Sequence, residues 1–169
     1  NPLNPYSASK ASSDHFVSAY ANTYNLPVVI TNCSNNYGPR QSFDKLIPKT
    51  ITNLLKGKKV PVYGRGKQIR DWLYVQDHCE ALIEVWKNGK VGDKYNIGGG
   101  IEMNNFALVS KIISLMGKDH SDIEFVDDRP GHDFRYSINC QKIENDLKWR
   151  SRYNFEEGLL ETIKWYENN

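Results

Sequence analysis

Two side chains near the start of the chain, Tyr6 and Lys10, have the types and the spacing of an acid–base pair. On a helix, residues four apart lie on one face about one turn apart. A lysine ammonium beside a phenol stabilises the phenolate and lowers the phenol pKa from about 10 toward neutrality, which suits a general base. The same spacing is common on helix surfaces for structural reasons, so the pair alone does not establish catalysis.

Positive charge is concentrated in one segment. Residues 40–70 contain nine Lys and Arg residues and one acid, a net charge of +8, whereas the whole chain carries only +2. A local basic field in a nearly neutral protein favours a small anionic ligand, such as a diphosphate, over a long nucleic acid. Arg70 and Arg129 offer planar donor forks to phosphate oxygens. Ion pairs with the neighbouring Asp71 and Asp128 are the structural alternative.

Several other side chains can bind a polar ligand. Asn35 and Asn36 follow a β-branched segment and can donate and accept hydrogen bonds, as sugar hydroxyls require, although turn formation explains them equally well. His132 follows a Pro-Gly turn, and a nearby diphosphate would favour its charged form. Tyr63 and Trp72 can stack on a base, but core packing explains them as readily.

Composition excludes several classes of protein. Apolar residues make up 39% of the chain, and no run approaches the roughly 18 apolar residues of a membrane helix, so we expect a soluble protein without a membrane partner. The three cysteines lack CxxC or Cys/His ligand spacing, so neither a disulfide framework nor a metal site is predicted. A reducing, cytoplasmic location is expected.

The pattern of apolar residues predicts one α/β body with alternating helices and strands. Ligands bind at the carboxyl ends of strands in such folds, here after the first strand, at the turn-forming residues 35–39. Residues 60–63 and 68–75 flank a Gly-Arg-Gly turn and are expected to pair as a hairpin. The predicted helices cover about residues 6–24, 46–56, 77–87, 105–116, 140–147 and 156–166; the predicted strands cover 27–33, 60–63, 68–75, 94–97 and 123–126.

A series of motifs carries a resemblance to a known family. The chain contains, in order, Pro-Tyr-Ser-Ala-Ser-Lys at 5–10, Ser-Asn-Asn-Tyr-Gly-Pro at 34–39, Ile-Arg-Asp-Trp at 69–72, Tyr-Asn-Ile-Gly-Gly at 95–99 and Arg-Pro-Gly-His-Asp at 129–133. With these motifs the sequence resembles the extended short-chain dehydrogenase/reductase family, and within it the dTDP-glucose 4,6-dehydratases. The resemblance runs nearly from end to end.

The resemblance implies roles for individual residues. Tyr6 would remove the proton of the sugar 4-hydroxyl as hydride leaves C4 for NAD, and Lys10 would hold the nicotinamide ribose. Asn36 would also contact the cofactor. The residues implied to bind the nucleotide-sugar substrate are Asn35, Lys45, Leu46, Pro61, Val62, Tyr63, Arg70, Asn105, Arg129 and His132.

The resemblance also implies an architecture. The chain would be the carboxy-terminal part of a doubly wound Rossmann-type NAD domain, interleaved with a small α/β substrate-binding lobe. Residues 1–40 would belong to the NAD domain and 41–169 mainly to the lobe. The chain starts without Met and has no Gly-rich phosphate turn, so we expect that turn and the Asp-Glu acid–base pair to precede Asn1, and this chain alone to be inactive. A homodimer through the helix that carries Tyr6 is expected.

Three functions remain open from the sequence. The first is a portion of a dTDP-glucose 4,6-dehydratase, which oxidises C4, eliminates water and returns hydride to C6. The second is a portion of another NAD-dependent nucleotide-sugar enzyme, an epimerase or a decarboxylase. The third is a non-catalytic nucleotide-sugar-binding module.

Overall fold

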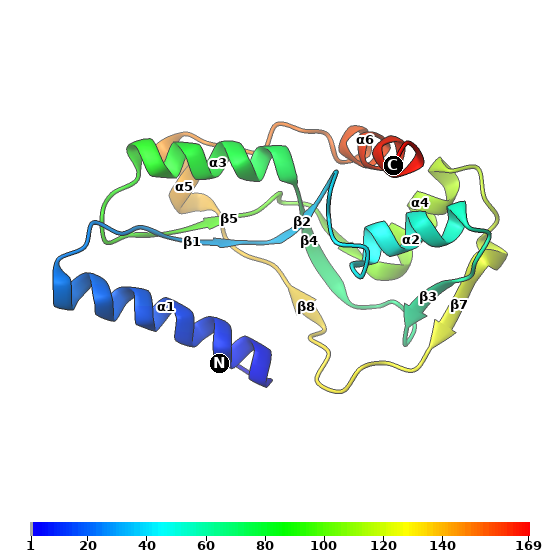
Figure 1. Ribbon diagram of the computed structural model, residues 1–169, viewed down its shortest axis with the longest axis horizontal. Helices are drawn as coiled ribbons and strands as arrows, with labels where there is room; N and C mark the ends of the chain where they lie inside the picture. Colours follow the sequence, from blue (N-terminus) through cyan, green and yellow to red (C-terminus); the bar gives the residue numbers. More distant parts are fainter. Residues whose placement is uncertain (1) are drawn as a thin grey trace.

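The computed structural model describes residues 2–169, in which helices and strands alternate (Figure 1). The helices are α1 (Pro5–Tyr24), α2 (Leu46–Leu55), α3 (Val75–Asn88), α4 (Asn105–Leu115), the short 3-10 helix η1 (His120–Asp122), α5 (Gln141–Leu147) and α6 (Phe155–Glu167). The strands are β1 (Ile30–Cys33), β2 (Asn35–Tyr37), β3 (Val60–Tyr63), β4 (Ile69–Tyr74), β5 (Lys94–Ile97), β6 (Glu102–Asn104), β7 (Ile123–Val126) and β8 (Arg135–Tyr136). Each predicted helix and strand is present, with ends shifted by a few residues.

Within residues 2–169 the strands form three small sheets. β1 pairs in parallel with β5, and β3 pairs in parallel with β7. β4 pairs in parallel with β2 and β8 and antiparallel with β6. β4 therefore connects segments that are far apart in the sequence, and it is the element around which the candidate site is built.

Local sequence signals explain why α1 begins and ends where it does. Asn4 caps the helix, because its Oδ1 accepts a hydrogen bond from the Ser7 N–H at 2.9 Å, and Pro5 occupies the first helical turn. The helix ends at Asn25, whose left-handed backbone (φ 54°) terminates the hydrogen-bond pattern. These signals place Tyr6 in the first turn of the helix.

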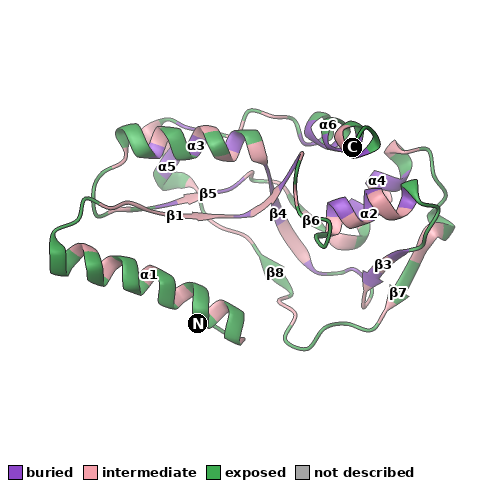
Figure 2. Cartoon of the chain, viewed as in Figure 1, coloured by how far each residue is buried: buried purple, intermediate pink, exposed green. Residues whose placement is uncertain are grey.

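The buried side chains form two clusters on opposite faces of β4. The first core cluster gathers α2, α4, α6 and the Trp72 face of β4. The second gathers α3, α5, β5 and the Leu73 face of β4. Neighbouring residues of a strand point to opposite faces, so Trp72 and Leu73 enter different clusters. α1 contributes no buried residue to either cluster, as Figure 2 shows.

The predicted hairpin between residues 60–63 and 68–75 is wrong. β3 pairs with β7 and β4 pairs with β2, β6 and β8, so the two strands separate after the Gly64–Gly66 turn. At Gly66 (φ +65°) a Cβ would lie 2.8 Å from both Phe106 and Val62, and the Gly66 carbonyl accepts a hydrogen bond from the Phe106 N–H at 3.0 Å. The turn packs against the start of α4 and so directs the chain away from a hairpin.

Residues 35–39 also differ from expectation. Asn35–Tyr37 form β2, which pairs with β4, so only the following residues make the turn. The sequence pattern also missed the short strands β6 and β8, which flank β4. Such short strands carry too few residues for a two-residue periodicity to be visible, and their positions depend on pairing with a distant segment.

Among residues 2–169, no helix is both long and apolar enough to cross a membrane. The three cysteines are unpaired in this part of the chain; Cys33 and Cys140 are half-buried and Cys79 is exposed. Burial raises the pKa of the Cys140 thiol to about 11, with the nearby Asp71 contributing.

Candidate functional site

A cavity of about 240 Å³ lies over the Trp72 face of β4. It is bordered by β2, by β3, by the starts of α2 and α4, and by the loop that contains Arg129 and His132. The residues that line it are Asn35, Gln41, Asp44, Lys45, Leu46, Lys49, Pro61, Tyr63, Arg70, Trp72, Asn105, Arg129 and His132. Nine of the ten residues expected to bind substrate are in this lining; they come from six separate segments of the sequence, and only tertiary structure brings them together.

The floor of the cavity is set by the register between β2 and β4. Asn35 stands opposite Trp72 in this parallel pair. Arg70 lies two residues before Trp72 on β4, and alternate residues of a strand share a face. Asn35, Trp72 and Arg70 therefore form a continuous row, whereas Asp71 points to the other face and is 1% exposed.

Arg70 has the surroundings of an anion-binding residue. Its guanidinium donates to the carbonyl oxygens of Ile69 and Asp133, at 2.7 and 2.8 Å. Among residues 2–169 no carboxylate forms an ion pair with it, so the alternative of a pair with Asp71 does not hold. Burial is the main cause that lowers the pKa of Arg70; the charge of Asp133 opposes this shift, and the charge of Arg129 adds to it. Two cations that face one cavity favour an anionic ligand.

The wall opposite the floor is an organised polar cluster. The Arg129 guanidinium lies 4.9 Å from the centre of the Tyr63 ring and 3.2 Å from His132 Nε2. His132 Nδ1 is 2.6 Å from Asp128 Oδ1, an arrangement in which the proton sits on Nδ1 and Nε2 accepts from Arg129. The hydrogen bond from His132 is the main cause of the lowered pKa of Asp128. These contacts orient the arginine and the imidazole before any ligand binds.

The starts of two helices complete the cavity. Lys45 is the residue before α2, and its ammonium lies 2.7 Å from Asp44. Hydrogen bonds from Lys45 and Ser42 lower the pKa of Asp44 to about 2, so Asp44 is ionised at neutral pH. Asn105 begins α4 and lines the cavity with a side-chain amide, whereas the first backbone N–H groups of the helix already have acceptors within the protein. The cavity therefore offers amides, ammonium and guanidinium groups together.

Tyr6 and Lys10 lie near the cavity without lining it. Tyr6 is 73% exposed, and the Asn4 Cβ would be 3.9 Å from a Cβ placed on Gly131, beside the Arg129–His132 loop. Tyr136 of β8 stands in register with Arg70 of β4, and its hydroxyl donates to the Cys33 carbonyl at 3.4 Å. Burial is the main cause of the raised pKa of Tyr136, with Tyr6 adding to the rise and Arg70 opposing it. The amino end of α1 thus lies at the edge of the site.

Asn36, expected at the cofactor, points to the face of β2 opposite Asn35. The side-chain Nδ2 of Asn36 donates to the backbone carbonyl of Ser34 at 3.1 Å, and the backbone carbonyl of Asn36 accepts from Gln41 Nε2 at 2.7 Å. Its Oδ1 is buried and has no partner among residues 2–169. A buried acceptor without a donor favours a ligand that supplies one.

Val62 is the exception among the expected substrate residues. Its side chain is 1% exposed and belongs to the first core cluster, whereas Pro61 and Tyr63 line the cavity. The two-residue period of β3 causes this difference, because it turns alternate side chains away from the cavity. The expectation is corrected to Pro61 and Tyr63 for side-chain contacts.

Sequence reasoning missed Gln41, Asp44 and Lys49, and it left Trp72 undecided between stacking and packing. Two of these residues could have been found from the sequence. Lys49 lies one helical turn after Lys45, and Trp72 lies two residues after Arg70 on a strand, so each shares a face with an expected substrate-binding residue. Gln41 carried no signal, since its loop is positioned by hydrogen bonds. The Gln41 side-chain Nε2 donates to the backbone carbonyl of Asn36, and the Gln41 backbone carbonyl accepts from the Tyr166 hydroxyl at 2.5 Å.

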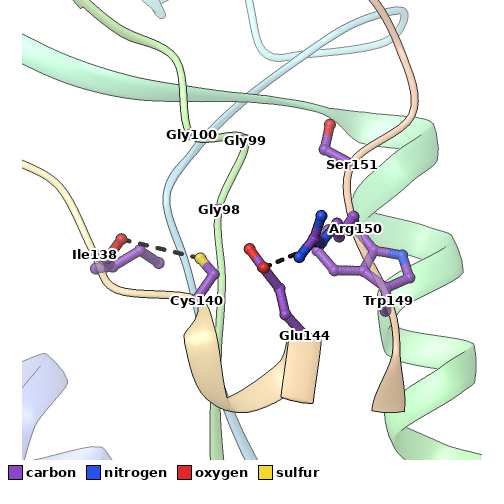
Figure 3. Close-up of a pocket in the computed structure, with 9 residues that line it drawn as sticks. All are labelled: Gly98, Gly99, Gly100, Ile138, Cys140, Glu144, Trp149, Arg150 and Ser151. Carbon is purple, nitrogen blue, oxygen red and sulfur yellow. Dashed lines mark hydrogen bonds and ion pairs between the residues drawn. The ribbon is translucent and has the colours of Figure 1, made fainter. Parts of the chain in front are cut away.

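A second cavity is larger, about 430 Å³, and lies beside the Gly98–Gly100 turn (Figure 3). Its two charged side chains, Glu144 and Arg150, are 3.1 Å apart and neutralise each other. Cys140, on its wall, has a raised pKa and is protonated at neutral pH. This cavity offers a sugar diphosphate no unpaired cation, so we place the candidate site in the smaller cavity.

Comparison with known proteins agrees with this geometry. A dTDP-glucose 4,6-dehydratase of Xanthomonas campestris is 50% identical to the chain. The alignment covers 99% of the chain and 50% of the relative. The structure of a dTDP-glucose 4,6-dehydratase from Bacillus anthracis in complex with NAD superposes with a TM-score of 0.95 and 54% identity, covering the whole chain and 54% of that structure. The expected resemblance and the Rossmann-type α/β fold are confirmed.

A more distant structure shares the fold. The UDP-glucuronic acid 4-epimerase of Bacillus cereus superposes with a TM-score of 0.94 but with 25% identity, over 99% of the chain and 54% of that structure. The chain spans about half the length of the curated relatives it matches. Residues 1–162 match the family described as GDP-mannose 4,6 dehydratase. This match covers nearly the whole sequence, and the chain therefore belongs to the GDP-mannose 4,6 dehydratase family.

Proposed function

We propose that this chain forms the substrate-binding portion, together with the Tyr-Lys pair, of an NAD-dependent dTDP-glucose 4,6-dehydratase. The observation that carries the proposal is the cavity in which Arg70 and Arg129, neither paired with a carboxylate among residues 2–169, face Asn35 across the floor of β4. The relatives at 50% identity or more share this activity by name, whereas the epimerase is only 25% identical.

The cavity residues divide into two groups by their chemistry. Arg70, with Asn105 at the start of α4, suits the diphosphate, because guanidinium and amide groups donate to anionic oxygens. Arg129, His132 and Tyr63 form the wall that suits the nucleoside. Lys45, Leu46 and Pro61 complete this end of the cavity, and Asn35 faces the hexose at the other end.

NAD fits the edge of the site beside α1. Lys10 and Asn36 would hold it; the buried, unpartnered Oδ1 of Asn36 suits an N–H donor such as a carboxamide. When bound, NAD supplies the hydride acceptor. Tyr6, as a phenolate, would accept the proton of the 4-hydroxyl and become a neutral phenol, and the Lys10 ammonium would favour the phenolate that begins this step. In the complete enzyme we propose oxidation at C4, loss of water and hydride return to C6.

The test uses the protein translated from the complete reading frame that contains this chain. Formation of the 4-keto-6-deoxy sugar from dTDP-glucose should be measured for the unchanged protein, Tyr6→Phe and Lys10→Met. Each substitution should lower kcat by about 100-fold or more while dTDP binding is retained. Because the chain spans about half the length of its relatives, we expect the 169 residues alone to bind dTDP-glucose but not to convert it.

Other products would identify the alternatives. Inversion at C4 without loss of water would assign an epimerase, and release of carbon dioxide from a nucleotide-linked uronic acid would assign a decarboxylase. Binding of dTDP-glucose by the complete protein with no affinity for NAD would assign a binding module. Any of these results would contradict the proposed activity.

We also propose a homodimer formed through α1. Phe16 and Tyr20 are 66% and 57% exposed and lie on the face of α1 opposite Asp14, which contacts β1 and β5. Tyr24 is 64% exposed and packs beside Tyr20, with the ring centroids 5.5 Å apart. Large exposed apolar side chains on one helix face favour a protein interface. Sedimentation of Tyr20→Lys should show a monomer. Leu160→Lys, at an exposed apolar residue of α6, is the control and should leave the dimer intact.

The organisation of the chain is proposed on the same basis. Residues 1–40 belong to the NAD domain and 41–169 mainly to the substrate lobe, with α3, β5 and α5 returning to the sheet of β1. A cytoplasmic location follows from the substrate class and from the three unpaired cysteines among residues 2–169. Chromatography after cell fractionation tests the location.

A further inference from the structure

We propose that Trp72 is a substrate-binding residue whose indole N–H donates a hydrogen bond to the β-phosphate of the nucleotide sugar. The inference rests on the proposed function, because it needs a diphosphate in the cavity. It assigns a specific role to a side chain that sequence reasoning left undecided between base stacking and core packing.

The first argument is the state of the indole nitrogen. Trp72 is 4% exposed, and its Nε1 has no hydrogen-bond partner among residues 2–169. The ring packs in the first core cluster, yet the residue also lines the candidate cavity. A buried donor without an acceptor destabilises the fold. A phenylalanine would fill the core without this cost, and a ligand in the cavity that accepts the hydrogen bond would remove it.

The second argument is position. Asn35 is the β2 partner of Trp72 in register, and Arg70 precedes Trp72 by two residues on the same face. In the proposed orientation Asn35 faces the hexose and Arg70 faces the diphosphate. Trp72 therefore lies at the junction of sugar and diphosphate, where the β-phosphate sits.

The third argument concerns the type of acceptor. Indole N–H donates only, so its partner must be an acceptor atom. Both terminal nitrogens of the Arg70 guanidinium already donate to backbone carbonyls, of Ile69 and Asp133. Arg70 therefore does not give all its N–H groups to the phosphate, and the phosphate can accept from a second donor. Anionic oxygens form stronger hydrogen bonds than neutral hydroxyls. The β-phosphate is the strongest acceptor at this end of the ligand.

Trp149 supplies the matched control. It is also buried, at 7% exposed, and its Nε1 also has no partner among residues 2–169, but it belongs to the second core cluster beside the other cavity (Figure 3). An unpartnered indole alone therefore does not mark a ligand site. Trp72 differs because it lines the same cavity as the two polar residues Asn35 and Arg70.

The experiment removes the N–H and keeps the ring shape. Benzothienylalanine, in which sulfur replaces the indole N–H, is incorporated at position 72 or 149 of the protein translated from the complete reading frame, with Trp72→Phe as a second variant. Calorimetry measures the affinity for dTMP, dTDP and dTDP-glucose. Removing a hydrogen bond to a charged acceptor should weaken dTDP and dTDP-glucose by about tenfold or more. Binding of dTMP, which lacks the β-phosphate, should change less than about twofold.

The indole resonance supplies an independent readout. In ¹⁵N-indole-labelled protein the Trp72 N–H signal should shift on addition of dTDP but not of dTMP, while the Trp149 signal stays in place. Equal weakening of dTMP and dTDP, unchanged affinity for all three, or an N–H signal insensitive to dTDP would overturn the role of Trp72. If the unchanged protein fails to bind dTDP-glucose at all, the proposed function itself fails.

Discussion

The substrate cavity and the helix that carries Tyr6 are supported in different ways. The cavity rests on the first core cluster, in which side chains such as Ile51 and Ile112 are fully buried. α1 has no buried residue and lies against β1 and β5 (Figures 1 and 2). Its polar contacts with these strands come from Asp14, which pairs with Lys94 at 3.3 Å and accepts a hydrogen bond from Asn32.

This difference separates two functions of the molecule. A cavity that must recognise a ligand by several donors needs side chains held in place by dense packing. The helix α1, which carries the proposed general base, presents small, half-buried residues to the sheet and its aromatic residues to the outside. In the described residues its stability therefore depends on few contacts, and its exposed face remains available for a partner. The predictions below test this contrast, beginning with the largest effect.

Ile112→Ala should lower the free energy of unfolding of the 169-residue chain by about 3–4 kcal/mol, because it removes fully buried methyl groups and leaves a void in the first core cluster. Urea denaturation measures the change. Phe16→Ala, at a residue 66% exposed on α1, should change it by less than about 0.5 kcal/mol. Equal losses would refute the contrast between the two regions.

Asp77→Ala tests the connection between the two core clusters. Asp77 lies in the first turn of α3 and is fully buried; its carboxylate accepts from the Ser151 hydroxyl at 2.6 Å and from the backbone N–H groups of Arg152 and Tyr153, both at 3.1 Å. The loss should be about 3 kcal/mol, since three partly buried donors would lose their acceptor. The control is Asp127→Ala, outside this network, and a similar loss there would refute the explanation.

Hydrogen exchange should distinguish α1, which has no buried residue, from α4, which is packed in the first core cluster. In the 169-residue chain the amides of α1 should exchange at least about tenfold faster than those of α4, because α1 has no buried face to hold it closed. Mass spectrometry of peptic peptides measures the rates. In the protein translated from the complete reading frame, formation of the proposed dimer should slow exchange of α1 selectively. Equal protection of α1 and α4 in the 169-residue chain would contradict the interpretation.

Asp14→Asn should have a smaller effect. The pair with Lys94 is solvent-accessible, so its loss should cost less than about 1 kcal/mol in global stability. Exchange of the α1 amides should nevertheless accelerate, because Asp14 makes the polar contacts to β1 and β5. An unchanged exchange rate would show that other contacts hold the helix.

The smallest expected effect is a pH dependence at β6 and β8. Arg135 donates to Glu102 at 2.8 Å, and this hydrogen bond is the main cause that lowers the Glu102 pKa from 4.5 to about 2. Because the pKa of Glu102 is lower in the folded protein, its hydrogen bond with Arg135 stabilises the fold fully above about pH 4.5, and this stabilisation is lost as the pH falls toward 2. The stability difference between the unchanged chain and Glu102→Gln should therefore shrink from pH 5 to pH 2.5. A difference that grows on acidification would contradict the sign.

Much of the fold was predictable because its signals are local. The Asn4-Pro5 start and the absence of Gly and Pro to Tyr24 identified α1, and β5 was located to the residue. The hairpin prediction failed at Gly64–Gly66, where the turn was read correctly but the partner was not. A turn determines how the chain bends, whereas pairing is decided by which distant strand, here β7, completes the ladder.

By itself the sequence determined the order of elements, the family resemblance and the types of side chain available for the site, because propensity, caps and motifs depend on neighbouring residues. Only the tertiary structure decided that Asn35, Arg70 and Arg129 share one cavity, that Val62 turns to the core and that Trp72 has an unpartnered N–H at the cavity. These features depend on strand register and packing between segments distant in the chain, which no local pattern encodes.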